Sequence, residues 1–224
     1  NGTDGMLGQL VMAIFDIEKS LKTLDISAAM SVEASLGTDR VFQPELHSIR
    51  PQLGQQDSAR NLALLLKDSP MVKSHAVDDH RVQDAYSMRC APQVAGAARD
   101  TLAHAQLIAD RELSSVIDNP IVLENGEIRS NGNFHGAPVA HVLDFLAISI
   151  TDAASMSERR TDNLLDEHRS AGLNAFLADD PGVDSGMMIA QYTQAGLVSE
   201  MKRLAVPASI DSIPSSAMQE DHVS

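Results

Sequence analysis

The chain has 224 residues and a net charge of −14 at pH 7, from 17 Lys and Arg against 31 Asp and Glu. This acidic balance argues against binding of nucleic acid or of an anionic membrane surface through bulk electrostatics. Hydrophobic residues at 43% can fill a sizeable core, which excludes a disordered chain, and with aromatics at only 3% that core must come from helix-favouring aliphatic side chains.

The first predicted element is one long helix close to the N-terminus. Its apolar residues alternate three- and four-residue steps, a heptad seam formed by Leu7, Leu10, Ile14, Ile17, Leu21 and Leu24. Gly37 is expected to end this helix. The polar stretch that follows to Asp57 is broken by Pro44 and Pro51, so we expect a long loop there. A short helix then ends near Ser69, with inward residues Leu62, Leu65 and Leu66.

The stretch from Val82 to Val94, VQDAYSMRCAPQV, sets three polar side chains at three-residue steps just before a helix start. Residues three apart on a helical turn lie close to one face, so Gln83, Tyr86 and Arg89 would point the same way. This set suits a substrate with a carboxylate, because a guanidinium can hold both carboxylate oxygens at once. The alternative, from these residues alone, is a solvated amphipathic turn.

Two further long helices are expected to begin at prolines. Pro92 suits the first position of a helix whose buried stripe is Val94, Ala98, Leu102, Ala105 and Ala109. Pro138 begins the next helix, whose seam is Val139, Leu143, Leu146, Ile150 and Ala153. Between these helices the helical period disappears, and apolar residues flank Asn125 and Gly126. This pattern predicts a small β-hairpin near 121–129.

A loop with a strong turn at Asp179–Gly182 precedes the last expected helix. That helix would be capped by Ser185, would end before Pro207, and carries Ile189, Leu197, Met201 and Leu204. Residues 209–224 are again expected to be loop. Together these elements predict an all-α fold, a single elongated helical bundle over residues 1–224. Its alanine-rich stripes would let helices approach closely and pack against other chains.

Other sequence features indicate the compartment of the protein and whether the chain is part of a longer one. The single cysteine, Cys90, cannot form an internal disulfide, which is typical of a reducing compartment. No apolar run approaches the roughly 20 residues of a membrane span, and no signal-peptide pattern is present. Both ends look cut from something longer, because Asn1 is not an initiator methionine and Ser224 closes a polar run.

Two more polar tracts lie in predicted loops, where binding groups usually sit. In Asn131–Gly136, glycines permit tight turns that could present Phe134 to a cavity, and Glu220 lies in a late polar tract. His75 and His80 are five residues apart, which is about 140° around a helix and poor for shared metal ligation. No metal site is therefore expected.

Seven tracts carry a further signal. They are NGTDGM at Asn1–Met6, VQDAYSMRCAPQVAGA at Val82–Ala97, SSVIDNPIV at Ser114–Val122, NGNFHGAPVA at Asn131–Ala140, SERRTDNLLD at Ser157–Asp166, SGMMIAQYTQAGLVSEMK at Ser185–Lys202 and PASIDSIPSSAMQEDHVS at Pro207–Ser224. In this order, and over the whole chain, they resemble the histidine ammonia-lyase family. Any one tract could mislead, but seven in register argue against coincidence.

The resemblance implies a cytoplasmic homotetramer with an L-aspartase-like helical bundle. It implies a carbon–nitrogen lyase that eliminates ammonia from L-histidine to give trans-urocanate, in histidine degradation. The family's electrophile is a methylidene-imidazolone (MIO), formed from an Ala-Ser-Gly upstream of the NGT tract and absent from this chain. The chain would then be the middle of the enzyme, inactive alone, with an amino acid as its small-molecule partner and no metal.

By the same resemblance, four residues bind the substrate. Asn1 would lie near the substrate carboxylate and the MIO carbonyl, and Arg89 would form a salt bridge with the carboxylate. Gln83 would hydrogen-bond in the same site, and Phe134 would shape the pocket around MIO.

Two residues would be catalytic. Tyr86 matches a tyrosine close to MIO, and Glu220 matches a glutamate that faces the imidazole or amino end of the substrate. The chain departs from many relatives at Asn131, where they have glycine, and at Met218, where they have asparagine; the second puts the hydrogen bonding near Glu220 in doubt. The guanidinium of Arg89, the phenol of Tyr86, the amide of Asn1 and the carboxylate of Glu220 are expected to converge on one hollow of amino-acid size, across subunit boundaries.

Three alternatives compete with this interpretation, and two of them stay open. A phenylalanine or tyrosine ammonia-lyase or aminomutase has the same fold, although Glu220 favours histidine because a carboxylate can accept a hydrogen bond from an imidazole N–H. The aspartase–fumarase relatives share the bundle, but their GSSxMPxKxN loop is not found. A non-enzymatic acidic helical interaction protein would explain the seams and the charge, but not the polar tracts.

Overall fold

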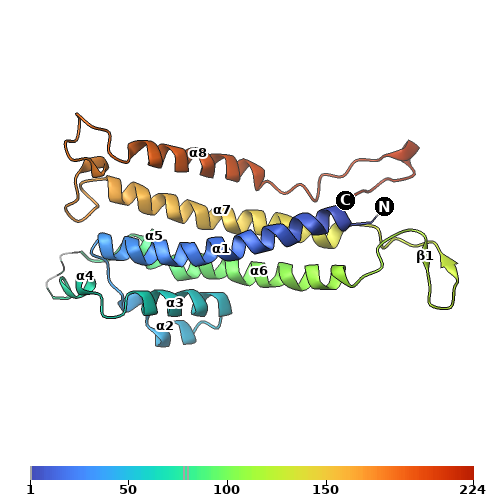
Figure 1. Ribbon diagram of the computed structural model, residues 1–224, viewed down its shortest axis with the longest axis horizontal. Helices are drawn as coiled ribbons and strands as arrows, with labels where there is room; N and C mark the ends of the chain where they lie inside the picture. The colour runs from blue at the N-terminus through green and yellow to red at the C-terminus, as the bar shows by residue number, and fades with distance from the viewer. Residues whose placement is uncertain (1, 78, 80) are drawn as a thin grey trace.

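The computed structural model describes residues 2–77, 79 and 81–224, and these form an elongated bundle of α-helices (Figure 1). The long helices are α1 (Asp4–Ala34), α6 (Ala91–Leu113), α7 (Ala137–Leu165) and α8 (Met188–Leu204). The shorter elements are η1 (Arg40–Phe42), α2 (Pro44–Ser48), α3 (Leu53–Leu65), α4 (Pro70–Lys73), α5 (Tyr86–Arg89), η2 (Ala175–Leu177) and η3 (Ser216–Met218). Strands β1 (Ile121–Val122) and β2 (Ile128–Arg129) pair antiparallel. The predicted all-α class with one small hairpin is confirmed.

The long helices lie side by side, so the bundle has two distinct ends. α1, α6 and α7 pack against one another, α3 packs on α6, and α8 packs on α7. Figure 1 shows α4 and α5 at the end where α1 finishes, and the hairpin and the C-terminal tail at the end where α1 begins. These are called the α5 end and the hairpin end below.

Two apolar clusters fill the bundle. The cluster toward the hairpin end joins α1, α6 and α7 and consists of Leu7, Leu10, Leu21, Ala98, Leu102, Ala105, Ala109, Val139, Val142 and Leu146. The cluster toward the α5 end consists of Ala28, Ala29, Val32, Phe42, Leu62, Leu66, Val72, Met88 and Ala91. Most residues of the three predicted seams therefore belong to the first cluster, with Ile14, Ile17, Leu24 and Leu143 packed against it partly buried. The predicted seam residues Val94, Ile150 and Ala153 do not belong to this cluster.

The expectation of a long loop up to Asp57 is wrong, because that stretch contains η1, α2 and the first turn of α3. Pro44 does not break structure there. It occupies the first position of α2, where the N–H that proline lacks would have had no helical partner. In the following helix Leu65 is half exposed, because it lies off the face that Leu62 and Leu66 share.

The end of α1 differs in detail from the prediction. Leu36, not Gly37, takes the left-handed conformation, with φ of 50°. Leu36 N–H donates to Glu33 O at 3.0 Å and Gly37 N–H donates to Val32 O at 2.7 Å, which is a Schellman closure. A side chain at Gly37 would lie 3.1 Å from Val32 and 3.2 Å from Asp84. A Cβ at position 37 would thus be tightly packed, and its neighbours would have to move by a few tenths of an ångström.

Three helix starts also differ by a residue or two. Pro92 and Pro138 each occupy the second position of their helix, because α6 begins at Ala91 and α7 at Ala137. Ser185 is not the N-cap of α8, since Met187 takes that position without a side-chain cap. The predicted residues of α8 are mostly exposed in a single copy, where Val198 is the buried one.

By length and composition α7 could cross a membrane, with a mean hydropathy of 1.4 over its most apolar 18-residue window. From the sequence we expected no apolar run long enough to span a membrane. In the structure α7 packs along α1, α6 and α8, and it buries Glu158, Arg160 and Asn163. One helix of this kind is weak evidence for a membrane protein, since core helices of globular proteins pass the same test.

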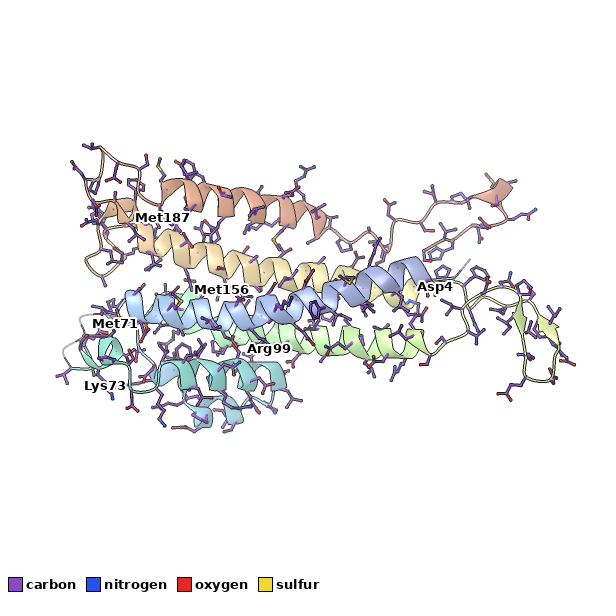
Figure 2. All side chains as sticks on the ribbon, in the orientation of Figure 1. Asp4, Met71, Lys73, Arg99, Met156 and Met187 are labelled. Atoms are coloured by element: carbon purple, nitrogen blue, oxygen red, sulfur yellow. The ribbon has the colours of Figure 1, made fainter. Side chains whose placement is uncertain are left out.

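A buried carboxylate joins three helices near the middle of the bundle. Asp25 of α1 accepts hydrogen bonds from Ser58 Oγ at 2.6 Å, from Asn61 Nδ2 at 2.7 Å and from Arg99 of α6 (Figure 2). Asp25 is only 3% exposed, but each oxygen has a donor, so the burial penalty of the charge is offset. This network ties α3 and α6 to α1.

Gly96→Ala is expected to lower the free energy of unfolding by about 3 kcal/mol, because α3 crosses α6 in backbone contact at this position. A Cβ atom at Gly96 would lie 2.4 Å from both Cα and N of Gln55, and one at Gly54 would lie 2.2 Å from Gly96 O. Neither neighbour is a flexible side chain, so the two helices must separate. Urea unfolding measures the change.

The matched control for this substitution is Gly8→Ala. Gly8 is an exposed residue of α1, and an added Cβ there meets nothing within 4 Å. This variant should be as stable as the parent or more stable by up to about 1 kcal/mol, since alanine favours helices over glycine. Equal unfolding midpoints for the two variants would contradict the close helix crossing.

Candidate active site

The short helix α5 carries two predicted site residues at the α5 end of the bundle. Ser87 and Met88 are buried, which leaves Tyr86 63% exposed and Arg89 half-buried. Gln83 precedes the helix, so the single helical face expected for all three residues is not formed. Gln83 and Arg89 nevertheless line the same hollow of about 330 Å³, while Tyr86 is not part of its wall.

The guanidinium of Arg89 is available to a ligand. Among the described residues it has no hydrogen-bond or ion-pair partner, although Arg81 and Asp79 line the same hollow. Arg81 and Asp79 lie near each other, with 3.6 Å between Nε and Oδ1. Because a guanidinium can bind both oxygens of a carboxylate, Arg89 suits the binding of an anionic group at this end.

The segment that leads into α5 is anchored to the end of α1. Asp84 is buried, and its Oδ2 accepts a hydrogen bond from Thr38 N–H at 2.8 Å. Arg81 Nη1 donates to Ser35 O at 2.7 Å, and it lies 3.6 Å from Asp84 Oδ1. Sequence reasoning missed both anchors, because nothing in a polar tract tells which of its charged residues turn inward.

At the hairpin end, the tract around Phe134 is joined to the C-terminal tail. The rings of His135 and His222 stack with centroids 5.6 Å apart and planes 1° from parallel. Gly136 N–H donates to Ser224 Oγ at 2.8 Å. Phe134 is 40% exposed beside this junction. The tail is therefore held against the start of α7, which puts two predicted tracts at one end of the bundle.

Glu220 lies in this tail as an exposed carboxylate with local donors. Its Oε2 accepts hydrogen bonds from Ser215 Oγ at 2.5 Å and from Ser216 Oγ at 2.8 Å. These bonds, the Ser215 bond most of all, hold the pKa of Glu220 below its usual value. A carboxylate with a lowered pKa stays ionised at neutral pH, so it suits accepting an N–H hydrogen bond better than removing a proton. The neighbouring Met218 is exposed and makes no hydrogen bond through its side chain.

The two groups of candidate residues lie at opposite ends of one copy. Arg81 donates a hydrogen bond to Ser35, just beyond the end of α1. The start of α7 instead lies against the beginning of α1, because a Cβ built at Gly136 would lie 2.7 Å from Met6 Sδ. The 31 residues of α1 span about 45 Å at 1.5 Å each. Figure 2 likewise shows Asp4 at the end opposite Met71 and Lys73. A single copy therefore does not bring Arg89 and Tyr86 to Phe134 and Glu220.

Two sequence-based expectations fall partly or wholly outside the described residues. Asn1, a predicted substrate-binding residue, lies outside them, as does His80 of the weighed metal pair. His75 is described, and its Nδ1 lies 3.5 Å from Asp79 Oδ2, within ion-pair distance but without hydrogen-bond geometry. Within the described part of the chain no group of three His, Cys, Asp or Glu residues could hold a metal ion.

Comparisons with known proteins agree along the whole chain. The sequence model of the family described as "Aromatic amino acid lyase" matches residues 1–224. The histidine ammonia-lyase of Streptomyces avermitilis is 69% identical over 224 residues, which are 100% of this chain and 44% of the relative, and that of Gloeobacter violaceus is 48% identical over 225 residues with the same coverage. The chain thus spans less than half the length of these relatives.

Solved structures give the same result for the fold. A histidine ammonia-lyase from Trypanosoma cruzi superposes with a TM-score of 0.89 at 41% identity, covering 100% of this chain and 41% of that one. A tyrosine aminomutase from Streptomyces globisporus superposes with a TM-score of 0.91 at 37% identity, covering 100% of this chain and 46% of that one.

Proposed function

The chain belongs to the aromatic amino acid lyase family, and from that premise we propose that it is the central part of a histidine ammonia-lyase. The reaction would be the elimination of ammonia from L-histidine to give trans-urocanate. The observation that carries this proposal is the guanidinium of Arg89, which has no partner among the described residues and lines a hollow of amino-acid size, about 330 Å³. Identity of 67–69% to histidine ammonia-lyases of three Streptomyces species supports the choice within the family.

Each candidate residue has a chemical task in such an elimination. Arg89 would hold the α-carboxylate, with Gln83 on the same wall of the hollow. Tyr86, exposed beside them, would exchange a proton near the reacting centre. Glu220, ionised at neutral pH, would accept a hydrogen bond from the imidazole N–H of histidine. Fixing the carboxylate and the ring orients the β-carbon between them, which can supply much of the rate.

The site would be shared between copies of the chain. Because Arg89 and Glu220 lie at opposite ends of one bundle, copies packed antiparallel would bring the α5 end of one to the hairpin end of another. Apolar side chains exposed on three long helices support such packing: Met12, Phe15, Met30, Phe145, Ile148, Ile189, Leu197 and Leu204. We propose a homotetramer in the cytoplasm, as the resemblance implies.

The electrophile MIO would come from an Ala-Ser-Gly outside this chain. The hairpin end fits such a group, because a hollow of about 490 Å³ is lined by Asn133 and His135, and the buried Nε2 of His135 has no partner among the described residues. Phe134 would border the group from this copy, and Tyr86 from a second copy. When present, the group supplies an electrophile that activates the amine for departure. The residues of this chain bind and orient the substrate around it.

A tyrosine aminomutase is the second candidate, because one of the similar solved structures carries that name at 37% identity. Its substrate would place a phenol where histidine places an imidazole. The carboxylate of Glu220 can accept a hydrogen bond from an imidazole N–H or from a phenol O–H, so it does not by itself choose between these two substrates. Substrate preference therefore separates the two candidates.

The full-length protein is expected to convert L-histidine to trans-urocanate at a rate of about 1–1000 per second, the usual range for enzymes. The conversion can be followed by the ultraviolet absorbance of the product and by released ammonia. L-tyrosine and L-phenylalanine, supplied at the same concentration, are the comparison substrates. Faster turnover of either one, or recovery of a β-amino acid, would overturn the proposal in favour of the second candidate.

A further inference from the structure

The helix α5 cannot hold its own orientation. It comprises four residues, Tyr86 to Arg89, and a helix of one turn is far too short to be stable alone. The directions of Tyr86 and Arg89 therefore depend on what holds the backbone between them. That backbone belongs to Ser87 and Met88, whose side chains are buried against the bundle.

The side chain of Arg160, on α7, donates a hydrogen bond to this backbone. Arg160 is 4% exposed, and its Nη1 donates a hydrogen bond to Ser87 O at 3.2 Å. Its Nη2 donates to Ser27 Oγ of α1, also at 3.2 Å. Figure 2 shows Met156, one turn earlier in α7, facing α1 toward the same end. The guanidinium of Arg160 thus links α1, α5 and α7.

Burying the positive charge of Arg160 costs desolvation free energy, which some interaction of the guanidinium must offset. Burial lowers the pKa of Arg160 to about 10, with the nearby Asp25 acting in the opposite direction, so the group stays protonated at neutral pH. Among the described residues its hydrogen-bond partners are a carbonyl and a hydroxyl, not a carboxylate. An apolar side chain would fill the space at lower cost, but it could not bond two acceptors on different helices.

We propose that Arg160 is a positioning residue of the active site, which fixes Tyr86 and Arg89 through the carbonyl of the residue between them. The inference rests on the proposed function for its kinetic consequence, but not for its structural one. Losing the bond to Ser87 frees the α5 turn to shift, and a shift of about 1 Å at a reacting group can cost about 100-fold in rate.

The structural consequence is tested by hydrogen exchange on the full-length protein. Arg160→Met keeps a flexible, unbranched side chain, although a shorter one, and removes its donors. Amide exchange in the segment 82–90 is expected to be at least about 10-fold faster in this variant, while the exchange of α6 and α8 stays unchanged. Arg159→Met is the matched control, because Arg159 is the adjacent exposed arginine, paired with Glu158. Unchanged exchange over 82–90 in Arg160→Met would overturn the inference.

The kinetic consequence is a loss of about 100-fold in kcat/KM for Arg160→Met, with partial recovery in Arg160→Lys, which restores a donor. Ser27→Ala is a milder variant whose folding is not at risk, and it should cost a few-fold by removing one acceptor of the guanidinium. A double-mutant cycle separates positioning from general destabilisation. Arg160→Met should cost much less when Arg89 is already alanine, whereas full additivity of the two losses would overturn the inference.

Failure of the proposed function would look different. A wild-type enzyme without histidine turnover would contradict the proposed function, while the exchange comparison between Arg160→Met and Arg159→Met would still decide the role of Arg160. If wild-type turnover is normal and Arg160→Met matches it in both exchange and kcat/KM, only the positioning role is lost.

Discussion

Arg89→Ala in the full-length enzyme is expected to lower kcat/KM for L-histidine by about 1000-fold without loss of folding. Two charge-assisted hydrogen bonds to the substrate carboxylate contribute about 4 kcal/mol together, and each 1.4 kcal/mol is about tenfold. The side chain is half-buried at the edge of a hollow and has no protein partner among the described residues, so its removal leaves no buried group unpaired. Steady-state kinetics and thermal unfolding of the same preparation measure both halves of this expectation.

The hollow itself offers a matched control for this variant. Arg40 lines the same hollow as Arg89 but is exposed and belongs to η1. Arg40→Ala should change kcat/KM by less than about threefold, since an exposed charge contributes little. Arg89→Lys should recover part of the loss, because an ammonium keeps the charge without the planar fork. Wild-type kinetics in Arg89→Ala would remove Arg89 from the substrate site.

The long helices could be predicted from the sequence because their signals are local. The seam from Leu7 to Leu24 repeats every seven residues, and burying that stripe needs only a neighbouring helix with a similar stripe. The prediction of a loop around Pro44 was wrong because the structure there does not depend on a local signal. The α2 helix owes its stability to the burial of Phe42 and His47, which periodicity over five residues cannot reveal.

The sequence singles out candidate site residues by type, but it does not give their positions in space. Gln83 and Arg89 were expected on one helical face, yet they line one hollow because Asp84 and Arg81 fasten the segment to the end of α1. Those tertiary bonds have no sequence period. The sequence also could not predict that Arg89 and Glu220 lie far apart. The fold of one chain places them at opposite ends of the bundle, and only packing between copies could bring them together.

The second large effect follows from that separation. Full-length Arg89→Ala and Glu220→Gln should each be nearly inactive alone, because every site then lacks the carboxylate anchor or the imidazole partner. Produced together, they should recover about a quarter of the wild-type activity. A shared site takes its α5 end from one copy and its hairpin end from another, and random mixing makes both ends intact in about one site of four.

The control for this recovery mixes two variants altered at the same end. Arg89→Ala with Gln83→Ala should show no more activity together than the mean of the two variants alone, because each α5 end in such a mixture carries one defect or the other. Two affinity tags, purified in succession, establish that the copies have mixed before activity is measured. Mixed oligomers of Arg89→Ala and Glu220→Gln without recovered activity would mean that the two ends of the bundle do not meet. Arg89 and Glu220 would then need separate explanations, since about 45 Å of α1 lies between the ends of a single copy.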